Sequence, residues 1–155
     1  MRLLVGVGVL ATATACGGKS EDPYAKSLSM GSEHIEFTAD ATNGKAHELI
    51  KGSGDFTNAP DRGRYSFVVR GAAQQQVFAN GRLYVNAYGE WLPSKVGAQS
   101  PQTPAQMFRA HLPATIENGL VRSITIRDKG GVATYVFSKY GEHVSVTVPR
   151  VKGTK

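Results

Sequence analysis

Residues 75–91, QQVFANGRLYVNAYGEW, decide the fold of this chain. Apolar and polar side chains alternate on both sides of Asn80-Gly81, and this period of two is typical of half-buried β-strands. The Asn-Gly dipeptide adopts the positive φ angles of a two-residue type I′ turn, which joins adjacent antiparallel strands. The stretch therefore predicts a β-hairpin with its tip at Asn80-Gly81.

The same alternation continues over most of the chain. Beyond the hairpin it covers residues 33–40, 64–71, 114–128, 130–141 and 143–149, and more weakly residues 46–56. Pro149 ends the last run because it lacks a backbone donor, and Gly52 and Gly54 indicate a break or a bulge in the weak run. The pattern predicts about nine strands in sequential hairpins, and hence a largely antiparallel sheet.

Two segments carry helical signals instead. In residues 100–112, Thr103 is the expected N-cap and Pro104 the first helical residue. The apolar stripe of this helix consists of Met107, Phe108 and Leu112. A short first helix is expected at residues 24–32, with Leu28 and Met30 packing against the sheet. The fold class is therefore α+β, mainly β: a curved antiparallel sheet with one or two helices on its concave face.

The N-terminal residues resemble the signal of a bacterial lipoprotein. Arg2 is followed by residues 3–15, LLVGVGVLATATA, which are uncharged but shorter than the roughly 20 apolar residues needed to cross a bilayer. Small residues precede Cys16, the only cysteine, as in the lipobox, although Ala13 replaces the usual leucine. The resemblance implies cleavage before Cys16 and acylation of this residue by a diacylglyceryl group and an amide-linked chain such as palmitate. The alternative is an ordinary secretory signal that happens to contain a cysteine.

These features divide the chain into three segments. We expect a signal peptide at residues 1–15, a lipidated tether at residues 16–26, and one folded domain at residues 27–155. Ten extended residues reach at most ~35 Å, so the domain can lie against the membrane or lift clear of it. The expected location is extracytoplasmic, with membrane lipid as a partner through the anchor.

The composition is basic, with 18 Lys+Arg against 12 Asp+Glu. The aromatic residues are scattered through alternating runs and form no basic–aromatic cluster, so no nucleic-acid partner is expected. The excess charge indicates either a solvated surface or an attraction to anionic lipid headgroups.

The sequence carries no recognisable catalytic or metal-binding pattern. It has no G-x-S-x-G elbow and no Gly-rich phosphate loop before a helix. The histidines lack H-x-x-x-H and H-E-x-x-H spacing; they are His34, His47, His111 and His143. We therefore expect no enzyme, no metal and no cofactor.

Four stretches, in this order, resemble actinobacterial lipoproteins of the LppX/LprG type. They are residues 29–40 (SMGSEHIEFTAD), 77–91, 112–126 and 137–149 (FSKYGEHVSVTVP). The family fold is a half-barrel, similar to the LolA/LolB carriers, in which helices lie in a bent antiparallel sheet around an apolar cavity for acyl chains. This chain looks shortened between Trp91 and Leu112, where a strand and a helix of the family are expected to be missing.

The resemblance implies that the protein binds or shuttles the acyl chains of a lipid or glycolipid. The candidates for the concave face are Ile35, Phe37, Tyr65, Phe67, Val77, Leu83, Val85, Ile124, Val136 and Val146, roofed by Met107, Phe108 and Leu112. Trp91 either rims the entrance or plugs the core. The alternative function is a surface lipoprotein with a filled core that binds a protein partner.

Overall fold

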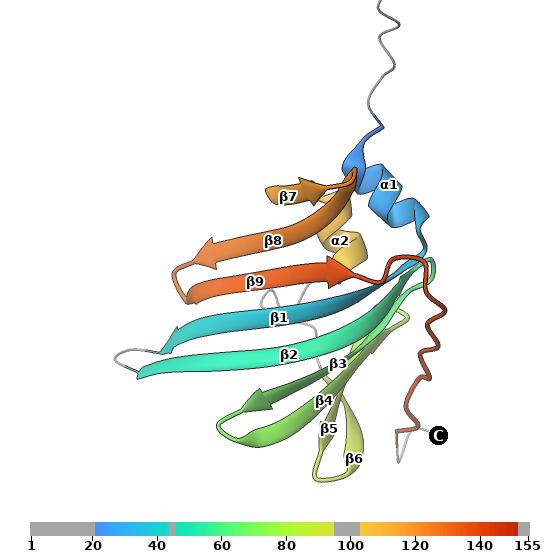
Figure 1. The fold of residues 1–155 in the computed structure, drawn as a ribbon. Coiled ribbons are helices and arrows are strands. Elements are labelled where there is room, and N and C mark those ends of the chain that lie inside the picture. The colour runs from blue at the N-terminus through green and yellow to red at the C-terminus, as the bar shows by residue number, and fades with distance from the viewer. Residues whose placement is uncertain (1–20, 44–45, 95–102, 152–155) are drawn as a thin grey trace, which may run out of the picture.

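The computed structural model describes residues 21–43, 46–94 and 103–151. They form one antiparallel sheet in the order β6-β5-β4-β3-β2-β1-β9-β8-β7, with two short helices (Figure 1). The helices are α1 (Pro23–Ser29) and α2 (Pro104–Arg109). The strands are β1 (Ser32–Asn43), β2 (Ala46–Asn58), β3 (Asp61–Val69), β4 (Ala72–Ala79), β5 (Arg82–Ala87), β6 (Glu90–Ser94), β7 (Ala114–Glu117), β8 (Leu120–Asp128) and β9 (Gly131–Ser138). The expected fold class is confirmed.

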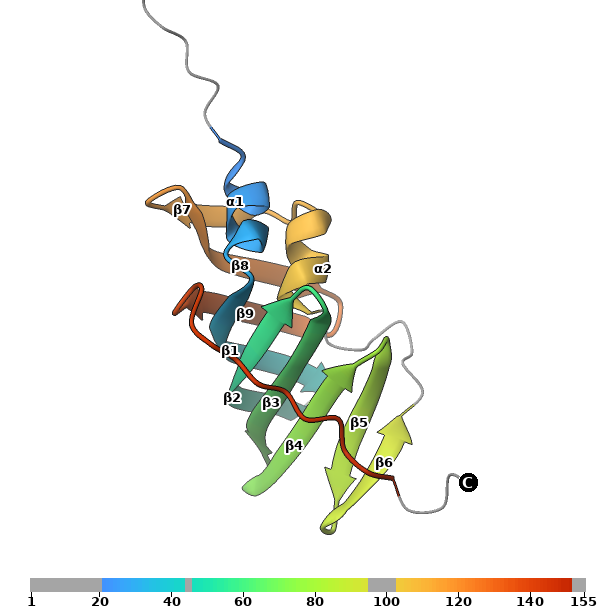
Figure 2. The ribbon, with the colours of Figure 1, turned by 90° about the vertical axis from the view of Figure 1, so that its right-hand side faces the viewer.

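The sheet bends but does not close, so β6 and β7 remain as its two edges (Figures 1 and 2). Both helices lie on the inner side of the bend. Helix α1 contacts α2 and β8, and α2 contacts β2. We call the side of the sheet that faces the helices the concave face and the opposite side the convex face.

The two Asn-Gly tips are tight turns, as predicted. Asn80 has φ 54° and Gly81 has φ 71°, and the corresponding values at Asn118 and Gly119 are 53° and 74°. Positive φ at both central residues is the signature of a type I′ turn, whose twist matches that of the flanking strands. These turns fix the registers of β4 with β5 and of β7 with β8 at their tips.

We expect Gly81→Val to lower the free energy of unfolding by about 1–2 kcal/mol, because a side chain disfavours the left-handed region. No heavy atom lies within 4 Å of the place where a Cβ would stand, so the loss reports backbone conformation and not a clash. Urea denaturation measures it. Arg82→Val, one residue further into β5, is the control, and equal losses in the two variants would contradict this account of the turn.

The start of helix α2 follows its predicted signals. The Thr103 side chain accepts a hydrogen bond from the Gln106 backbone, the Gln106 side chain accepts one from the Thr103 backbone, and Pro104 follows the cap. Helix α1 is capped by Asp22 and therefore includes residues 23–26, which the sequence assigned to the tether. Met30 lies after this helix and is 38% exposed, so its expected packing against the sheet is wrong.

The glycines of β2 do not interrupt the strand. β2 runs through 13 residues without a register shift, so the expected break at Gly52 and Gly54 is wrong. A Cβ on Gly52 would stand 2.5 Å from Phe67 Cβ and 2.6 Å from Phe37 Cε1. The glycine is needed because aromatic side chains from the neighbouring strands lie over the β2 backbone.

The sheet irregularity lies between β7 and β8 instead. Thr115 pairs with Ser123 and Ile116 pairs with Val121, which leaves Arg122 as an extra residue in β8. Residues three apart in a regular strand point to opposite faces. The bulge removes this constraint, and Val121 and Ile124 are both fully buried in one core.

The run at residues 143–149 is not a strand, and this expectation is wrong. The chain leaves β9, whose two neighbours β1 and β8 already occupy both of its edges, so the valine-rich segment cannot form a hairpin with the strand that precedes it. Residues 142–151 cross the convex face instead (Figure 2). The structure nevertheless has nine strands, the number expected. The run at residues 81–91, which was expected to form one strand, turns at Tyr88-Gly89 and forms both β5 and β6.

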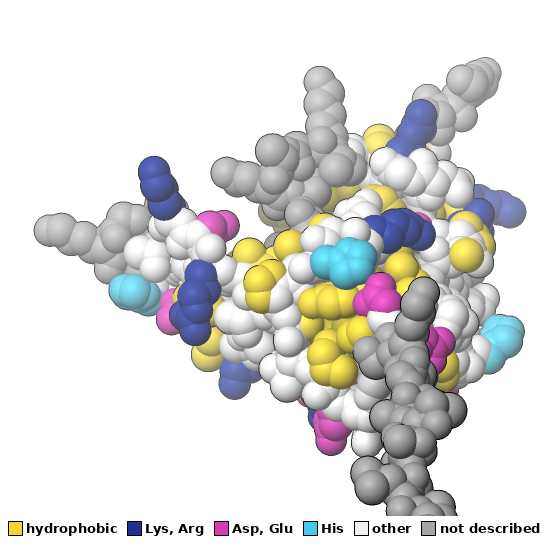
Figure 3. Space-filling view, turned by 90° about the horizontal axis from the view of Figure 1, so that it is seen from above, with side chains coloured by type: hydrophobic (Ala, Val, Ile, Leu, Met, Phe, Trp, Pro, Cys, Tyr) yellow, Lys and Arg dark blue, Asp and Glu magenta, His cyan; other side chains and the backbone are white. Residues whose placement is uncertain are grey.

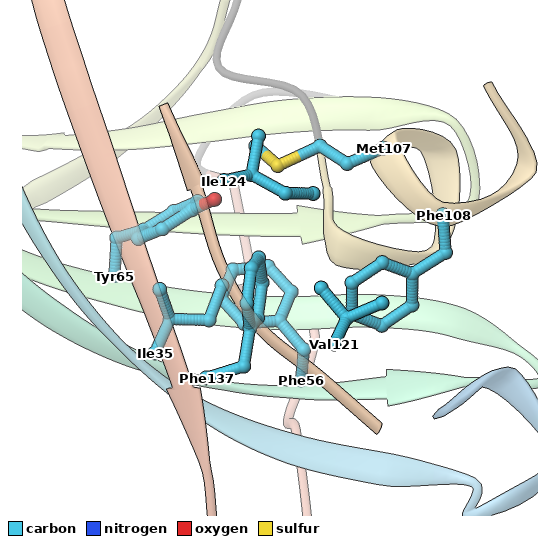
Figure 4. Close-up of a cluster of buried hydrophobic side chains, with 8 residues drawn as sticks. All are labelled: Ile35, Phe56, Tyr65, Met107, Phe108, Val121, Ile124 and Phe137. Carbon is cyan, nitrogen blue, oxygen red and sulfur yellow. The ribbon is translucent and has the colours of Figure 1, made fainter. Parts of the chain in front are cut away.

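The main core lies between the sheet and the helices (Figure 4). It consists of Ile35, Phe56, Tyr65, Met107, Phe108, Val121, Ile124 and Phe137. The rings of Phe108 on α2 and Phe137 on β9 meet edge to face with centroids 5.0 Å apart. This end of the concave face is therefore filled by side chains.

Candidate functional site

The strand registers place most candidates on the concave face. Paired residues on neighbouring strands have their side chains on the same face of the sheet. Ile35 pairs with Gly54, which pairs with Tyr65, and the face of each further residue is assigned in the same way from its partner. The candidates on this face are Ile35, Phe37, Tyr65, Phe67, Leu83, Val85 and Ile124. Met107 and Phe108 join them from α2, and Leu112 packs beside the same core.

Three candidates face the other way, so their expected inward orientation is wrong. Val77 pairs with Arg64, and Val136 pairs with Glu36, so both belong to the convex face. Val146 lies in the C-terminal segment and packs against the convex side of β4. In the run Val77–Phe78–Ala79 every residue is buried, because the C-terminal segment covers the convex side, and alternation of polarity cannot assign faces there.

An apolar cavity of about 140 Å³ opens on the concave face beyond the filled core. Its lining consists of Phe37, Ala39, Ile50, Tyr65, Phe67, Gln76 and Tyr135. The residues come from β1, β2, β3, β4 and β9, so the bend of the sheet, and not one loop, forms the site. We call it the concave cavity.

Phe37 is the centre of the aromatic wall. Its ring centroid lies 5.6 Å from that of Tyr65, 6.1 Å from that of Phe67 and 6.0 Å from that of Tyr135. Burial raises the pKa of both tyrosines, so the phenols are uncharged over the physiological range. The cavity is therefore lined by aromatic rings and carries no charged side chain, and the Gln76 amide is a polar group in its lining.

Four lining residues were missed by the sequence reasoning: Ala39, Ile50, Gln76 and Tyr135. Tyr135 could have been found, since it alternates with Phe137, whereas the sequence reasoning took Val136 as the inward residue. Ile50 becomes visible only through its pairing with Ala39, which depends on the register of the first hairpin.

A buried polar cluster closes the concave face near the helices. Asn58 Nδ2 donates to Glu33 Oε2 at 2.9 Å, and Arg109 donates to the Asn58 carbonyl at 3.3 Å. Thr103 Oγ1 donates to Asp61 Oδ2 at 2.8 Å. Burial, with a smaller contribution from nearby Asp61, raises the pKa of Glu33 to about 8. Glu33 is thus mainly uncharged at neutral pH.

Other expected features lie partly outside the described residues. Cys16, the signal peptide and most of the tether are among residues 1–20, which the structure does not describe. Within the described ranges, no group of His, Cys, Asp and Glu side chains could hold a metal ion, and neither helix has the length and apolar character needed to span a membrane.

Comparisons with known proteins support the fold. No family model and no curated protein matches the chain. LprF from Mycobacterium bovis, a solved structure of the LppX/LprG type, matches with a TM-score of 0.50 at 12% sequence identity. The match covers 83% of this chain and 93% of LprF. The half-barrel expected from the resemblance is confirmed at the level of the fold. The expected loss of a section between Trp91 and Leu112 stays a prediction, because residues 95–102 lie outside the described residues.

Proposed function

We propose that the protein binds acyl chains of a membrane lipid or glycolipid in the concave cavity. The observation that carries this proposal is the aromatic lining around Phe37, which lies next to a core that already excludes water. Each Å² of apolar surface that a chain buries there contributes about 25 cal/mol. No reacting group is required, so the proposed role is non-enzymatic.

The size of the cavity limits how a lipid binds. Its volume of about 140 Å³ resembles that of cavities that accept one benzene-sized group and is below the roughly 300–1,000 Å³ of pockets that enclose whole drug-sized ligands. We infer that the end of one chain enters the cavity. The remainder of the lipid lies outside it.

The second part of the proposal is an anchor at Cys16, which would hold the domain at the outer side of the cell membrane. Helix α1 begins at the end of the molecule seen in Figure 3, where hydrophobic side chains gather among charged ones. A tether entering at α1 would keep this end toward the bilayer. The lipid would then move between the membrane and the cavity over a short distance.

The filled core beneath the helices favours the second candidate, a surface protein that binds a protein partner. The two functions differ in one property, which is the uptake of an apolar chain by the concave cavity.

A fluorescent fatty acid tests this property. Ala39 lines the concave cavity, and Thr38 beside it belongs to the convex face. We expect Ala39→Phe to fill the cavity and weaken uptake of a dansyl-labelled fatty acid at least about tenfold, whereas Thr38→Phe should bind like the unchanged protein. Equal binding by both variants, or no uptake by the unchanged protein, would favour the partner-binding function.

A further inference from the structure

A second hollow lies on the convex face, between the sheet and the C-terminal segment. Its volume is about 460 Å³, which falls within the range of small-molecule sites. The sheet side is formed by Ser53, Gly54, Asp55, Arg64, Ser66, Gln75, Val77 and Trp91, and the covering segment contributes Ser145, Val146, Thr147 and Pro149. We call it the convex groove.

The sequence explains why the hollow exists. Ser53 pairs with Ser66, and Ser66 pairs with Gln75, so two of the smallest polar side chains lie side by side at its floor. The segment above is held at one end by Val146 and Val148, which pack against the cluster of Val77, Ala79 and Tyr84. In the described part of the chain, residues 143–150 make no backbone hydrogen bond to the sheet. The segment therefore spans the floor without closing onto it.

The groove walls are polar but electrically balanced. His34 Nδ1 lies 2.7 Å from Asp55 Oδ1, and an Arg64 guanidinium nitrogen lies 3.8 Å from Asp55 Oδ2. The carboxylate thus has two partners, and Arg64 is not an unpaired cation. Such walls favour a neutral ligand over a phosphate, which would meet the Asp55 carboxylate.

The remaining polar side chains can both donate and accept hydrogen bonds. Ser53, Ser66 and Gln75 make no side-chain hydrogen bond to another described residue, and neither do Ser145 and Thr147 on the cover. Hydroxyl and amide groups combine donor and acceptor capacity. Trp91 adds an aromatic surface at one side, suited to a ligand that also carries C–H groups.

From this combination we propose that the convex groove is a binding site for a neutral saccharide. A sugar ring presents hydroxyl groups that donate and accept together with an apolar C–H face, and it carries no charge. The site lies on the opposite side of the sheet from the concave cavity. It is therefore independent of the proposed lipid binding.

Trp91 gives a direct readout because it is the only tryptophan in the chain. The full chain, kept in a detergent without a sugar headgroup, is titrated with trisaccharides of glucose and of mannose. We expect a saturable change in tryptophan emission with a Kd below about 10 mM for one of them, and none with inorganic phosphate. A response to phosphate alone, or no saturable response to either sugar, would overturn the proposal.

Four variants locate the binding. Ser66→Leu should fill the floor and abolish the response, and Thr38→Leu, on the same face outside the groove lining, should leave it unchanged. Gln75→Ala, in the neighbouring strand β4, should weaken it and covers the case in which Ser66→Leu does not fold. Ala39→Phe should retain saccharide binding while losing the fatty acid, so the two sites can fail separately. A sugar response that survives in both Ser66→Leu and Gln75→Ala would place the binding elsewhere.

Discussion

Phe108→Ala is expected to lower the free energy of unfolding by about 3–5 kcal/mol, the range found when a buried aromatic side chain is deleted. Phe108 is fully buried, and its ring meets Phe137 edge to face. Helix α2 has only six residues, too few to be stable by itself, so its position depends on this contact with the sheet. Denaturation by urea, followed by circular dichroism, measures the loss.

The matched control deletes a large apolar side chain that packs little. Leu92 is 51% exposed, and Leu92→Ala should change the free energy of unfolding by less than about 0.5 kcal/mol. If Phe108→Ala cost no more than Leu92→Ala, helix α2 would not be docked as described, and the filled end of the concave face would be wrong.

Glu33→Gln is expected to change how stability depends on pH. Burial raises the pKa of Glu33 in the folded protein to about 8, from a reference value of 4.5. Between these values the folded state holds a proton that the unfolded state has released. The contribution of Glu33 is therefore fully present below pH 4.5 and is lost as the pH rises through 8, with a slope of up to about 1.4 kcal/mol per pH unit.

The glutamine amide in this variant would imitate the protonated acid at every pH. We expect Glu33→Gln to be more stable than the unchanged protein at pH 8 and to show a shallower decline between pH 5 and pH 8. A residual decline should remain, because burial also raises the pKa of Asp61. The control is Glu36→Gln on the convex side of the same strand, which should keep the full slope. Parallel pH profiles for Glu33→Gln and the unchanged protein would show that Glu33 is charged in the folded state.

The sequence was sufficient for most of the strands, for the two Asn-Gly tips and for the start of helix α2, because these depend on local chemistry. Asn80-Gly81 and Thr103-Pro104 act through the backbone of a few neighbouring residues, and the structure has them as predicted. The orientation of Val77 and of Val136 could not be obtained in the same way. Apolar residues occur on both faces of β4 and β9, and only the pairing partners distinguish the two faces.

The C-terminal segment shows that alternating polarity alone does not predict a strand. Residues 143–149 alternate like a strand, but alternation indicates only that one side of an extended chain is covered. Whether a sheet edge is available depends on the order of all nine strands. The lining of the concave cavity could not be predicted for the same reason. Ala39, Ile50 and Tyr135 come together only when β1, β2 and β9 are paired in the correct register.

The most direct test of lipid binding is native mass spectrometry of the full chain, purified from a host with a lipoprotein pathway and released gently from detergent. The account predicts a bound lipid whose mass remains with the protein after the detergent is removed and is absent from Ala39→Phe, while Thr38→Phe retains it. A protein that carries no lipid, or a lipid held equally by Ala39→Phe, would contradict the assignment of the concave cavity as an acyl-chain site.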